Sequence, residues 1–399
     1  MTGSNDWRDH YAHRMMRTLG APLARLERGE GAWVWDDEGT RYLDFLAGIA
    51  VNSLGHAHPV FVEAVSRQAA TLAHVSNYFA TRPTMELADR LTRLSGAGDA
   101  GRVWFGNSGA EANEAAFKLA RRNNSGGART RVLALVDAFH GRTMGSLALT
   151  GKPAMRDGFE PLPGGVTHLP STVEALEAAM DDSVAALILE PIKGEAGVLE
   201  LPPGYLEAAR ELTRRHGALL IVDEIQTGAG RTGEWFAYQH AGILPDAITV
   251  AKGIGGGIPI GGLVTFGHAS DLFSKGQHGS TFGGNPLATS VAGAVLDEIE
   301  GADLVGNAAR RGIQLRERVE GLGSPLVAGV RGRGLLVGVA LAEPVAGHVS
   351  AAAMEAGLIV NAANDSTIRI APPLTIGDAE LDEFQDRFGR ALAAVADTL

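Results

Sequence analysis

The feature that constrains the fold most is a series of short, uninterrupted apolar runs, each followed by turn residues and a helical pattern. Such runs are typical of strands buried on both faces, because a strand with one wet face alternates polar and apolar residues. The helical segments between them supply the crossovers that parallel strands need. We therefore expect an α/β protein with a mostly parallel sheet, helices on both faces, and strands at 102–105, 132–136, 185–190, 218–223, 247–251 and 262–266.

The pattern changes after about residue 290. A long helical pattern there leads to short strand patterns within 330–341, 357–362 and 367–373, and then to a closing helix. This mixture predicts a smaller α+β domain. We expect three parts: an N-terminal segment, 1–50, that packs with the small domain, a large domain, 51–290, and a small C-terminal domain, 291–399.

Charge and composition exclude several classes of protein. The net charge of −11 over 399 residues argues against nucleic acid as a main partner, because phosphate contacts need a basic surface. The absence of cysteine excludes disulfides, thiolate metal sites and a thiol nucleophile, and it fits a reducing compartment. The first 20 residues contain no apolar stretch of the signal-peptide kind, so we expect a cytoplasmic protein with no membrane partner.

Polar residues that follow the apolar runs are candidates for a site, because open parallel sheets bind ligands beyond the carboxyl ends of their strands. Ser108, Gly109 and Ala110 open a helical pattern whose first N–H groups could hold a phosphate, although an ordinary serine cap reads the same way. Phe139 and Arg142 could stack on a ring and bind a carboxylate, or belong to a surface loop.

Acidic residues and one lysine follow the next runs. Glu190 and Glu195 bracket Lys193, Asp223 ends a buried run, and Lys252 stands between "ITVA" and a glycine-rich loop. A buried carboxylate is costly unless it is paired, so we expect Asp223 to meet a cation. Lys252 either extends its amine to water or keeps it accessible for chemistry. Pyridoxal phosphate is the cofactor that needs a lysine, an acid for its ring nitrogen, a phosphate cup and a stacking aromatic together.

A resemblance to a known family rests on a set of motifs in a fixed order. The chain resembles the class III, ω-amino-acid aminotransferases of the fold-type I pyridoxal-phosphate enzymes through "NSGAEANEAAFKLAR", "AFHGRT", "EPIKGEAGV", "LLIVDEIQTGAGRTG", "AKGIGGGIPIGG", "GSTFGGNP" and "IRIAPP". The resemblance implies pyridoxal 5'-phosphate as cofactor, amino-acid and 2-oxo-acid substrates, and a homodimer with shared active sites.

The resemblance also implies roles at the cofactor ring. Lys252 would hold the cofactor covalently and move the proton between the substrate carbon and C4′. Asp223 would keep the ring nitrogen protonated, Gln226 would bond the 3-oxygen of the ring, and Phe139 would stack on it.

A second group of residues would hold the phosphate. Ser108, Gly109 and Ala110 would form the cup, and Ala110 departs from the threonine that many family members have there. Thr281 would reach the phosphate of the neighbouring subunit, with Ser280 near the substrate.

Two arginines would bind the substrates. By the resemblance, Arg142 takes the distal carboxylate and Arg369 takes the α-carboxylate of glutamate or 2-oxoglutarate, with Glu195 as a gate that pairs with Arg369. Strand alternation puts Arg369 on the face opposite Ile368 and Ile370, as a strand-borne clamp requires. The alternative is an arginine at the rim of the sheet.

The resemblance implies N2-acetylornithine as the amino donor and 2-oxoglutarate as the acceptor. Free ornithine, succinylornithine, succinyl-diaminopimelate and 4-aminobutyrate remain alternative donors. A catalytically silent, pyridoxal-phosphate-binding regulator is the alternative from another class, but no DNA-binding appendage is visible.

Two further patterns suggest other sites. The glycines after Lys252 could suggest a dinucleotide-binding turn, but a strand pattern rather than a helix follows them. His56 and His58 stand two residues apart, yet no third ligand is near in sequence, and the resemblance makes them structural. We predict no metal site.

Overall fold

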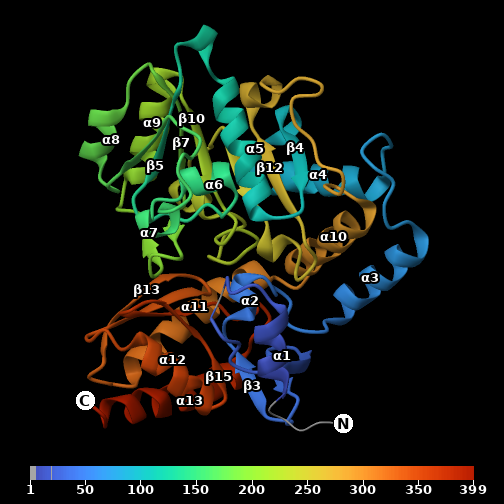
Figure 1. Ribbon diagram of the computed structural model, residues 1–399. Coiled ribbons are helices and arrows are strands. Elements are labelled where there is room, and N and C mark those ends of the chain that lie inside the picture. Colours follow the sequence, from blue (N-terminus) through green and yellow to red (C-terminus); the bar gives the residue numbers. More distant parts are fainter. Residues whose placement is uncertain (1–5, 19) are drawn as a thin grey trace.

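The computed structural model describes residues 6–18 and 20–399. A large sheet with its helices forms one half of the protein, and smaller sheets with three long helices form the other (Figure 1). Among the described residues no helix is both long and apolar enough to cross a lipid bilayer.

The large sheet has seven strands in the order β4-β12-β11-β10-β7-β5-β6. Strand β12 runs antiparallel to both its neighbours, and the remaining pairs are parallel. All six expected strands are present, and β6 is the one that the sequence did not predict. The bounds are β4 Arg102–Gly106, β5 Arg131–Leu135, β6 Val166–Leu169, β7 Val184–Leu189, β10 Leu219–Asp223, β11 Ala247–Val250 and β12 Gly261–Thr265.

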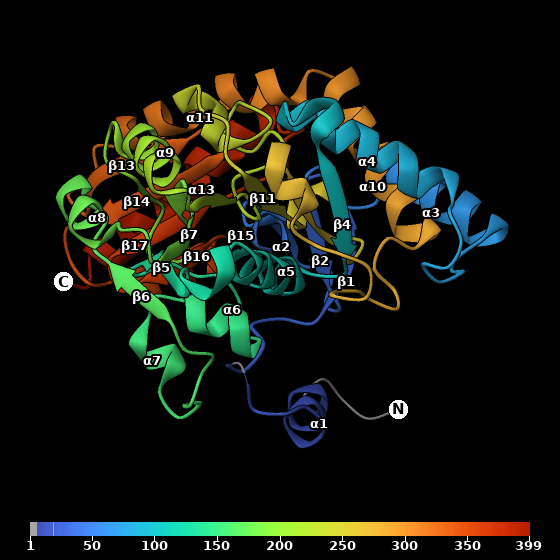
Figure 2. The ribbon, with the colours of Figure 1, turned by 90° about the horizontal axis from the view of Figure 1, so that it is seen from above.

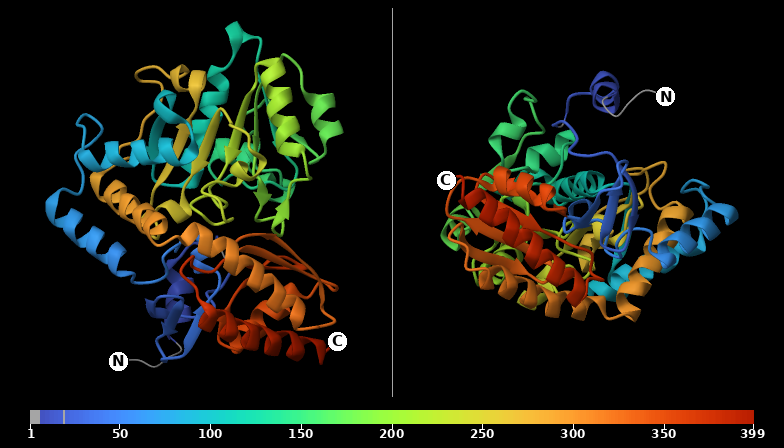
Figure 3. Two further views of the ribbon diagram at one scale, coloured as in Figure 1. Left: turned by 180° about the vertical axis from the view of Figure 1, so that it is seen from behind. Right: turned by 90° about the horizontal axis from the view of Figure 1, so that it is seen from below.

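Helices cover both faces of this sheet, as expected. Leu219 and Ile221 of β10 pack in one apolar cluster with α5, and Leu220 and Val222 pack in the core on the opposite face. Helices α3 and α10 run side by side at one end (Figures 1 and 3). The helices of this half are α3 Pro59–Thr71, α4 Arg82–Ser95, α5 Gly109–Arg122, α6 Met144–Leu149, α7 Pro153–Arg156, α8 Val173–Ala179, α9 Tyr205–His216 and α10 Pro286–Gly301.

The other half joins the two ends of the chain. Strand β3 pairs in parallel with β15, so the N-terminal hairpin shares a sheet of order β1-β2-β3-β15 with a C-terminal strand. An antiparallel sheet of order β13-β14-β17-β16 lies beside it. The division into parts at residues 50 and 290 stays a prediction. The strands are β1 Leu26–Glu30, β2 Trp33–Asp36, β3 Arg41–Asp44, β13 Val327–Arg333, β14 Leu336–Leu341, β15 Leu358–Ile359, β16 Asn361–Asn364 and β17 Thr367–Ile370.

Helices α11 Leu304–Gly321, α12 Ala346–Glu355 and α13 Asp378–Ala396 accompany these sheets, and a four-residue helix, α2 Ala47–Ala50, lies between the halves. Helix α1 Asp6–Arg14 stands away from the rest of the protein when the molecule is seen from above or below (Figures 2 and 3). A short hairpin, β8 Ile192–Lys193 with β9 Leu199–Glu200, encloses the loop that carries Glu195.

Candidate active site

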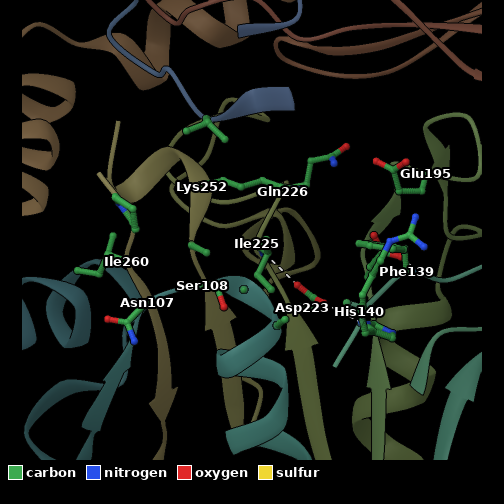
Figure 4. Close-up of a pocket in the computed structure, with 18 of the residues that line it drawn as sticks. Asn107, Ser108, Phe139, His140, Glu195, Asp223, Ile225, Gln226, Lys252 and Ile260 are labelled. Atoms are coloured by element: carbon green, nitrogen blue, oxygen red, sulfur yellow. Dashed lines mark hydrogen bonds and ion pairs between the residues drawn. The ribbon is translucent and has the colours of Figure 1, made fainter. Parts of the chain in front are cut away.

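A cavity of about 490 Å³ opens at the edge of the large sheet where the parallel strands end (Figure 4). The polar residues predicted at these strand ends meet around it, because the carboxyl ends of parallel strands share one edge. The predicted residues that line it are Ser108, Gly109, Ala110, Phe139, Arg142, Glu195, Asp223, Gln226 and Lys252.

Asp223 lines the cavity and is 4% exposed. Its Oδ2 accepts hydrogen bonds from Asn113 Nδ2 at 2.8 Å and His140 Nδ1 at 2.7 Å. Its Oδ1 accepts only the backbone N–H of Ile225, at 3.1 Å, among the residues described. Since a carboxylate oxygen has two lone pairs, Oδ1 can accept another donor from the cavity.

The two side chains that hold Asp223 were not assigned this role from the sequence. Asn113 is fully buried on the apolar face of α5, and an amide on such a face is the signal that could have found it. His140 follows the predicted Phe139 directly. Burial lowers the pKa of His140, but the hydrogen bond and charge of Asp223, with the charge of Glu190, outweigh this effect and raise it. The Asp223 carboxylate therefore favours protonation of His140.

Glu190, at the end of β7, belongs to the same buried cluster. Its Oε2 accepts the backbone N–H of Phe139 at 2.9 Å, which holds the Phe139 segment against the strand end. Burial raises the pKa of Glu190 to about 7, an effect that the positive charge of His140 opposes and the negative charge of Asp223 reinforces.

Lys252 follows β11 and lies across the cavity from Asp223 in Figure 4. Burial lowers the pKa of its amine, while Glu195 raises it and Arg369 lowers it further. Its backbone φ of 44° is uncommon for a residue with a Cβ. The loop that follows is tight, because a Cβ on Gly255 would stand 2.4 Å from the carbonyl oxygen of Ile258. A lysine with a lowered pKa is suited to act as a nucleophile and base.

The start of α5 offers backbone donors to the cavity. Ser108 is the N-cap residue, and its Oγ accepts the N–H of Glu111 at 3.2 Å. The N–H groups of Gly109 and Ala110 have no acceptor among the described residues. A helix start with free N–H groups can bind an anion. The sequence suggested either a serine cap or an anion site here, and this first turn of α5 has the features of both.

Phe139 and Arg142 lie on the cavity wall. The Arg142 guanidinium carbon is 5.8 Å from the centre of the Phe139 ring, and Arg142 is exposed, without a carboxylate within ion-pair distance among the described residues. Ile225 lies on the other side of Asp223 from Phe139 in Figure 4. A planar ring seated above Asp223 would therefore meet an apolar side chain on either side.

Arg369 comes from the other half of the protein and is 1% exposed. It is not a rim arginine. Its Nη1 donates to Glu195 Oε1, and its Nε donates to Asn361 Oδ1 at 3.0 Å. The Gln226 side chain lies beside this pair, with Oε1 3.4 Å from Arg369 Nη1. Burial raises the pKa of Glu195, but the charge and hydrogen bond of Arg369 outweigh this and lower it.

Ser280 and Thr281 do not line this cavity. They line a separate surface hollow with Asn77 and Tyr78, and Ser280 Oγ is 3.2 Å from Asn107 Nδ2. Thr281 is exposed and Ser280 is half-buried in the single chain. The chain alone therefore does not bring them to its own Lys252.

The two histidines with the metal-like spacing each face a different carboxylate. His56 Nε2 is 2.8 Å from Asp44 Oδ2, and His58 Nε2 is 4.0 Å from Glu298 Oε1. Among residues 6–18 and 20–399 no three potential ligands cluster as a metal would require.

The donors and acceptors of the cavity fit a pyridine ring that carries a phosphate. Asp223 Oδ1 is available to a ring N–H, and the free N–H groups of Gly109 and Ala110 are available to an anion. Lys252 supplies an amine of lowered pKa to the same cavity.

Comparisons with known proteins identify the family. The model of the aminotransferase class-III family matches residues 15–392. The chain is 54% identical over 389 residues to a Mycobacterium bovis protein named acetylornithine aminotransferase, covering 96% of each. It is similar to the N-acetylornithine aminotransferase structure from Stenotrophomonas maltophilia, with a TM-score of 0.85, 35% identity, and 98% and 100% of the two chains covered. It is also similar to a Toxoplasma gondii ornithine aminotransferase structure with pyridoxal phosphate at partial occupancy in its active site, with a TM-score of 0.93, 33% identity, and 99% and 96% covered.

Proposed function

The chain belongs to the class III aminotransferases, and we propose from this premise that it transfers the terminal amino group of N2-acetyl-L-ornithine to 2-oxoglutarate. The products are N-acetyl-L-glutamate 5-semialdehyde and L-glutamate, and the reaction belongs to arginine biosynthesis. The observation that carries this assignment is the 54% identity over almost the whole length of an acetylornithine aminotransferase. A cytoplasmic location fits a chain without cysteine.

The cofactor is pyridoxal 5'-phosphate, which, when bound, draws electrons from the bonds of the reacting carbon. Lys252 would hold the cofactor through Nζ, and the same amine would move the proton of the substrate carbon. The lowered pKa of Lys252 supports both tasks, since a neutral amine is needed for each.

Asp223 keeps the ring nitrogen protonated through Oδ1. His140 and Asn113 occupy Oδ2 and so fix the carboxylate plane. Phe139 would stack on the ring and Gln226 would donate to its 3-oxygen, since both side chains line the cavity.

The phosphate is held by Ser108 and by the N–H groups of Gly109 and Ala110. Ala110 has no hydroxyl to add, so the backbone and Ser108 carry more of this contact than they do in a chain with threonine there.

The two amino donors differ at the reacting carbon. Glutamate carries a carboxylate there and acetylornithine does not, so one site has to accept both. Arg142 binds the distal carboxylate of either substrate, which its exposed and unpaired guanidinium supports. Arg369 binds the α-carboxylate of glutamate or 2-oxoglutarate. Glu195 pairs with Arg369 while acetylornithine reacts and leaves it for glutamate, since an unpaired buried arginine is costly.

The active unit is a homodimer with shared sites. Thr281 reaches the phosphate of the partner subunit and Ser280 lies near the partner's substrate, a role supported by their position outside the lining of the cavity in their own chain. Exposed apolar side chains surround them, with Tyr78 at 95%, Phe79 at 68% and Phe282 at 61% exposure, more than a monomer normally leaves in one place. Helix α1 projects from its own chain and can pack on a second one (Figure 2).

A competition experiment tests the substrate. Acetylornithine, ornithine, succinylornithine, succinyl-diaminopimelate and 4-aminobutyrate are offered to one preparation with 2-oxoglutarate, and kcat/KM is measured for each. We expect acetylornithine to be preferred over ornithine by on the order of tenfold, as the identity to acetylornithine aminotransferases favours. A preference for ornithine would show that the proposed amino donor is wrong, while the assignment as a transaminase would still hold.

A further inference from the structure

Glu195 lies between two cations that contact different parts of the residue. Arg369 binds its carboxylate, and Lys152 Nζ donates to its backbone carbonyl oxygen at 2.6 Å. Lys152 lies in the turn between α6 and α7, in the half that contains the large sheet. No role in the proposed reaction has been given to it so far.

The Lys152 ammonium has capacity left after this contact. It has three N–H donors, and among the residues described here it makes one hydrogen bond, to Glu195. It is half-buried, so its charge is screened less than that of a fully exposed lysine. Its positive charge contributes, after those of Arg369 and Lys252, to lowering the pKa of the Glu195 carboxyl group.

The backbone of the Glu195 loop is held from both halves of the protein. Arg331 Nη2 donates to Gly197 O at 2.7 Å, and Asn364 Nδ2 donates to Ala196 O at 2.9 Å. With Lys152 on the adjacent carbonyl, three consecutive residues have their carbonyl oxygens bound. A change of partner by Glu195 is therefore a rotation of its side chain about a fixed backbone.

Such a rotation can bring the carboxylate to Lys152. The ammonium already touches the carbonyl oxygen of the same residue, and staggered rotamers place a glutamate carboxylate on different sides of its own backbone. The Glu195 side chain is 26% exposed against 1% for Arg369, so it has room to turn that its partner lacks.

We propose that Lys152 is a positioning residue that receives the Glu195 carboxylate when a substrate α-carboxylate takes its place on Arg369. The inference rests on the proposed exchange of Glu195 between two states and names the partner of the second state. Without such a partner, a half-buried carboxylate would be left unpaired each time glutamate binds, and glutamate binding would be weakened accordingly.

Two variants separate the charge of Lys152 from its hydrogen bond. K152Q keeps a donor for the Glu195 carbonyl and removes the charge, and K152R keeps both. Each half-reaction of the holoenzyme is followed alone by the absorbance of the bound cofactor, with glutamate or acetylornithine as the only substrate. We expect K152Q to raise the apparent Kd for glutamate on the order of fivefold, as a partly exposed ion pair predicts, and to change the acetylornithine half-reaction by less than twofold. K152R is expected to restore glutamate binding.

The same comparison in an E195Q background is the control. With no carboxylate to receive, K152Q should then leave the apparent Kd for glutamate unchanged. Equal slowing of both half-reactions by K152Q, or an undiminished effect in E195Q, would overturn the proposal. The glutamate half-reaction does not depend on the identity of the amino donor, so failure of the acetylornithine assignment remains distinguishable from failure of this inference.

Discussion

Two carboxylates of the candidate site, Asp223 and Glu195, differ in how they are held. Asp223 is 4% exposed and accepts three hydrogen bonds, from a histidine, an asparagine and a backbone N–H of the same half of the protein. The Glu195 side chain is 26% exposed and is paired with a single arginine that comes from the other half. A group held by several partners within one core stays in place, whereas a group with one partner can exchange it.

The difference follows from where the partners lie in the fold. Asn113 is on α5, which packs directly on the sheet that contains Asp223, so separating them would disrupt an apolar cluster. Arg369 is on β17, in a sheet that shares no strand with the first. We infer that the Asp223 region supplies a constant electrostatic environment and that the Glu195 region distinguishes two substrates.

The largest loss of turnover is expected for a substitution of Lys252, which acts in both half-reactions. The K252A substitution removes the amine that links the cofactor and moves the proton. Turnover should therefore fall on the order of 10⁴-fold or more in both half-reactions. Borohydride reduction followed by peptide mapping should label Lys252 in the unchanged protein. A label on another lysine would contradict the assignment.

The next effect tests the constant region. D223N keeps the size of the side chain and removes the charge that holds the proton on the ring nitrogen. We expect turnover to fall at least 100-fold, about 2.7 kcal/mol of barrier, while the cofactor still binds. Both half-reactions should suffer alike, because the ring is common to them. Near-normal turnover would refute the role of Asp223.

A smaller loss of turnover is expected for a substitution of His140, which acts on the ring only through Asp223. H140Q removes the imidazole that pairs with Asp223 and leaves the contacts of Asn113 and Ile225. We expect a loss on the order of tenfold, equal in both half-reactions, since a hydrogen bond to a charged group contributes about 1.5 kcal/mol or more. A loss confined to one half-reaction would mean that His140 helps to distinguish the substrates. It would then contradict the assignment of a constant environment to the Asp223 region.

The smallest effect on catalysis is expected at Glu190, where stability is the better measurement. Its pKa is raised from 4.5 to about 7 by burial, so the folded apo-protein binds more protons than the unfolded chain between these values. Wild-type stability should therefore fall with rising pH by up to about 1.4 kcal/mol per pH unit in this window, and E190Q should lack this loss. Denaturant unfolding at pH 5, 6, 7 and 8 measures it, and parallel curves for the two proteins would contradict the raised pKa.

Much of the fold could be predicted because six strands of the large sheet are continuous apolar runs. Strand β6 was missed because it is only partly buried, and "VTHL" shows no such run. Most of the cavity residues could be predicted for a related reason, since parallel strands end at one edge.

The contacts that the sequence could not predict are made between side chains from distant elements. Lys152 reaches Glu195 across 43 residues, and Asn361 meets Arg369 through the register of β16 against β17. No local periodicity contains that information. The roles of Thr281 and Ser280 depend on a second chain and stay predictions.

The most direct test of the account measures the two half-reactions of E195A separately by stopped-flow absorbance. Removing the acid leaves Arg369 free throughout. The account predicts that glutamate reacts as fast as in the wild type or faster, while acetylornithine is slowed, because the bare arginine lacks its partner in that half-reaction alone. Equal slowing of both half-reactions would contradict it and would make Glu195 a structural residue.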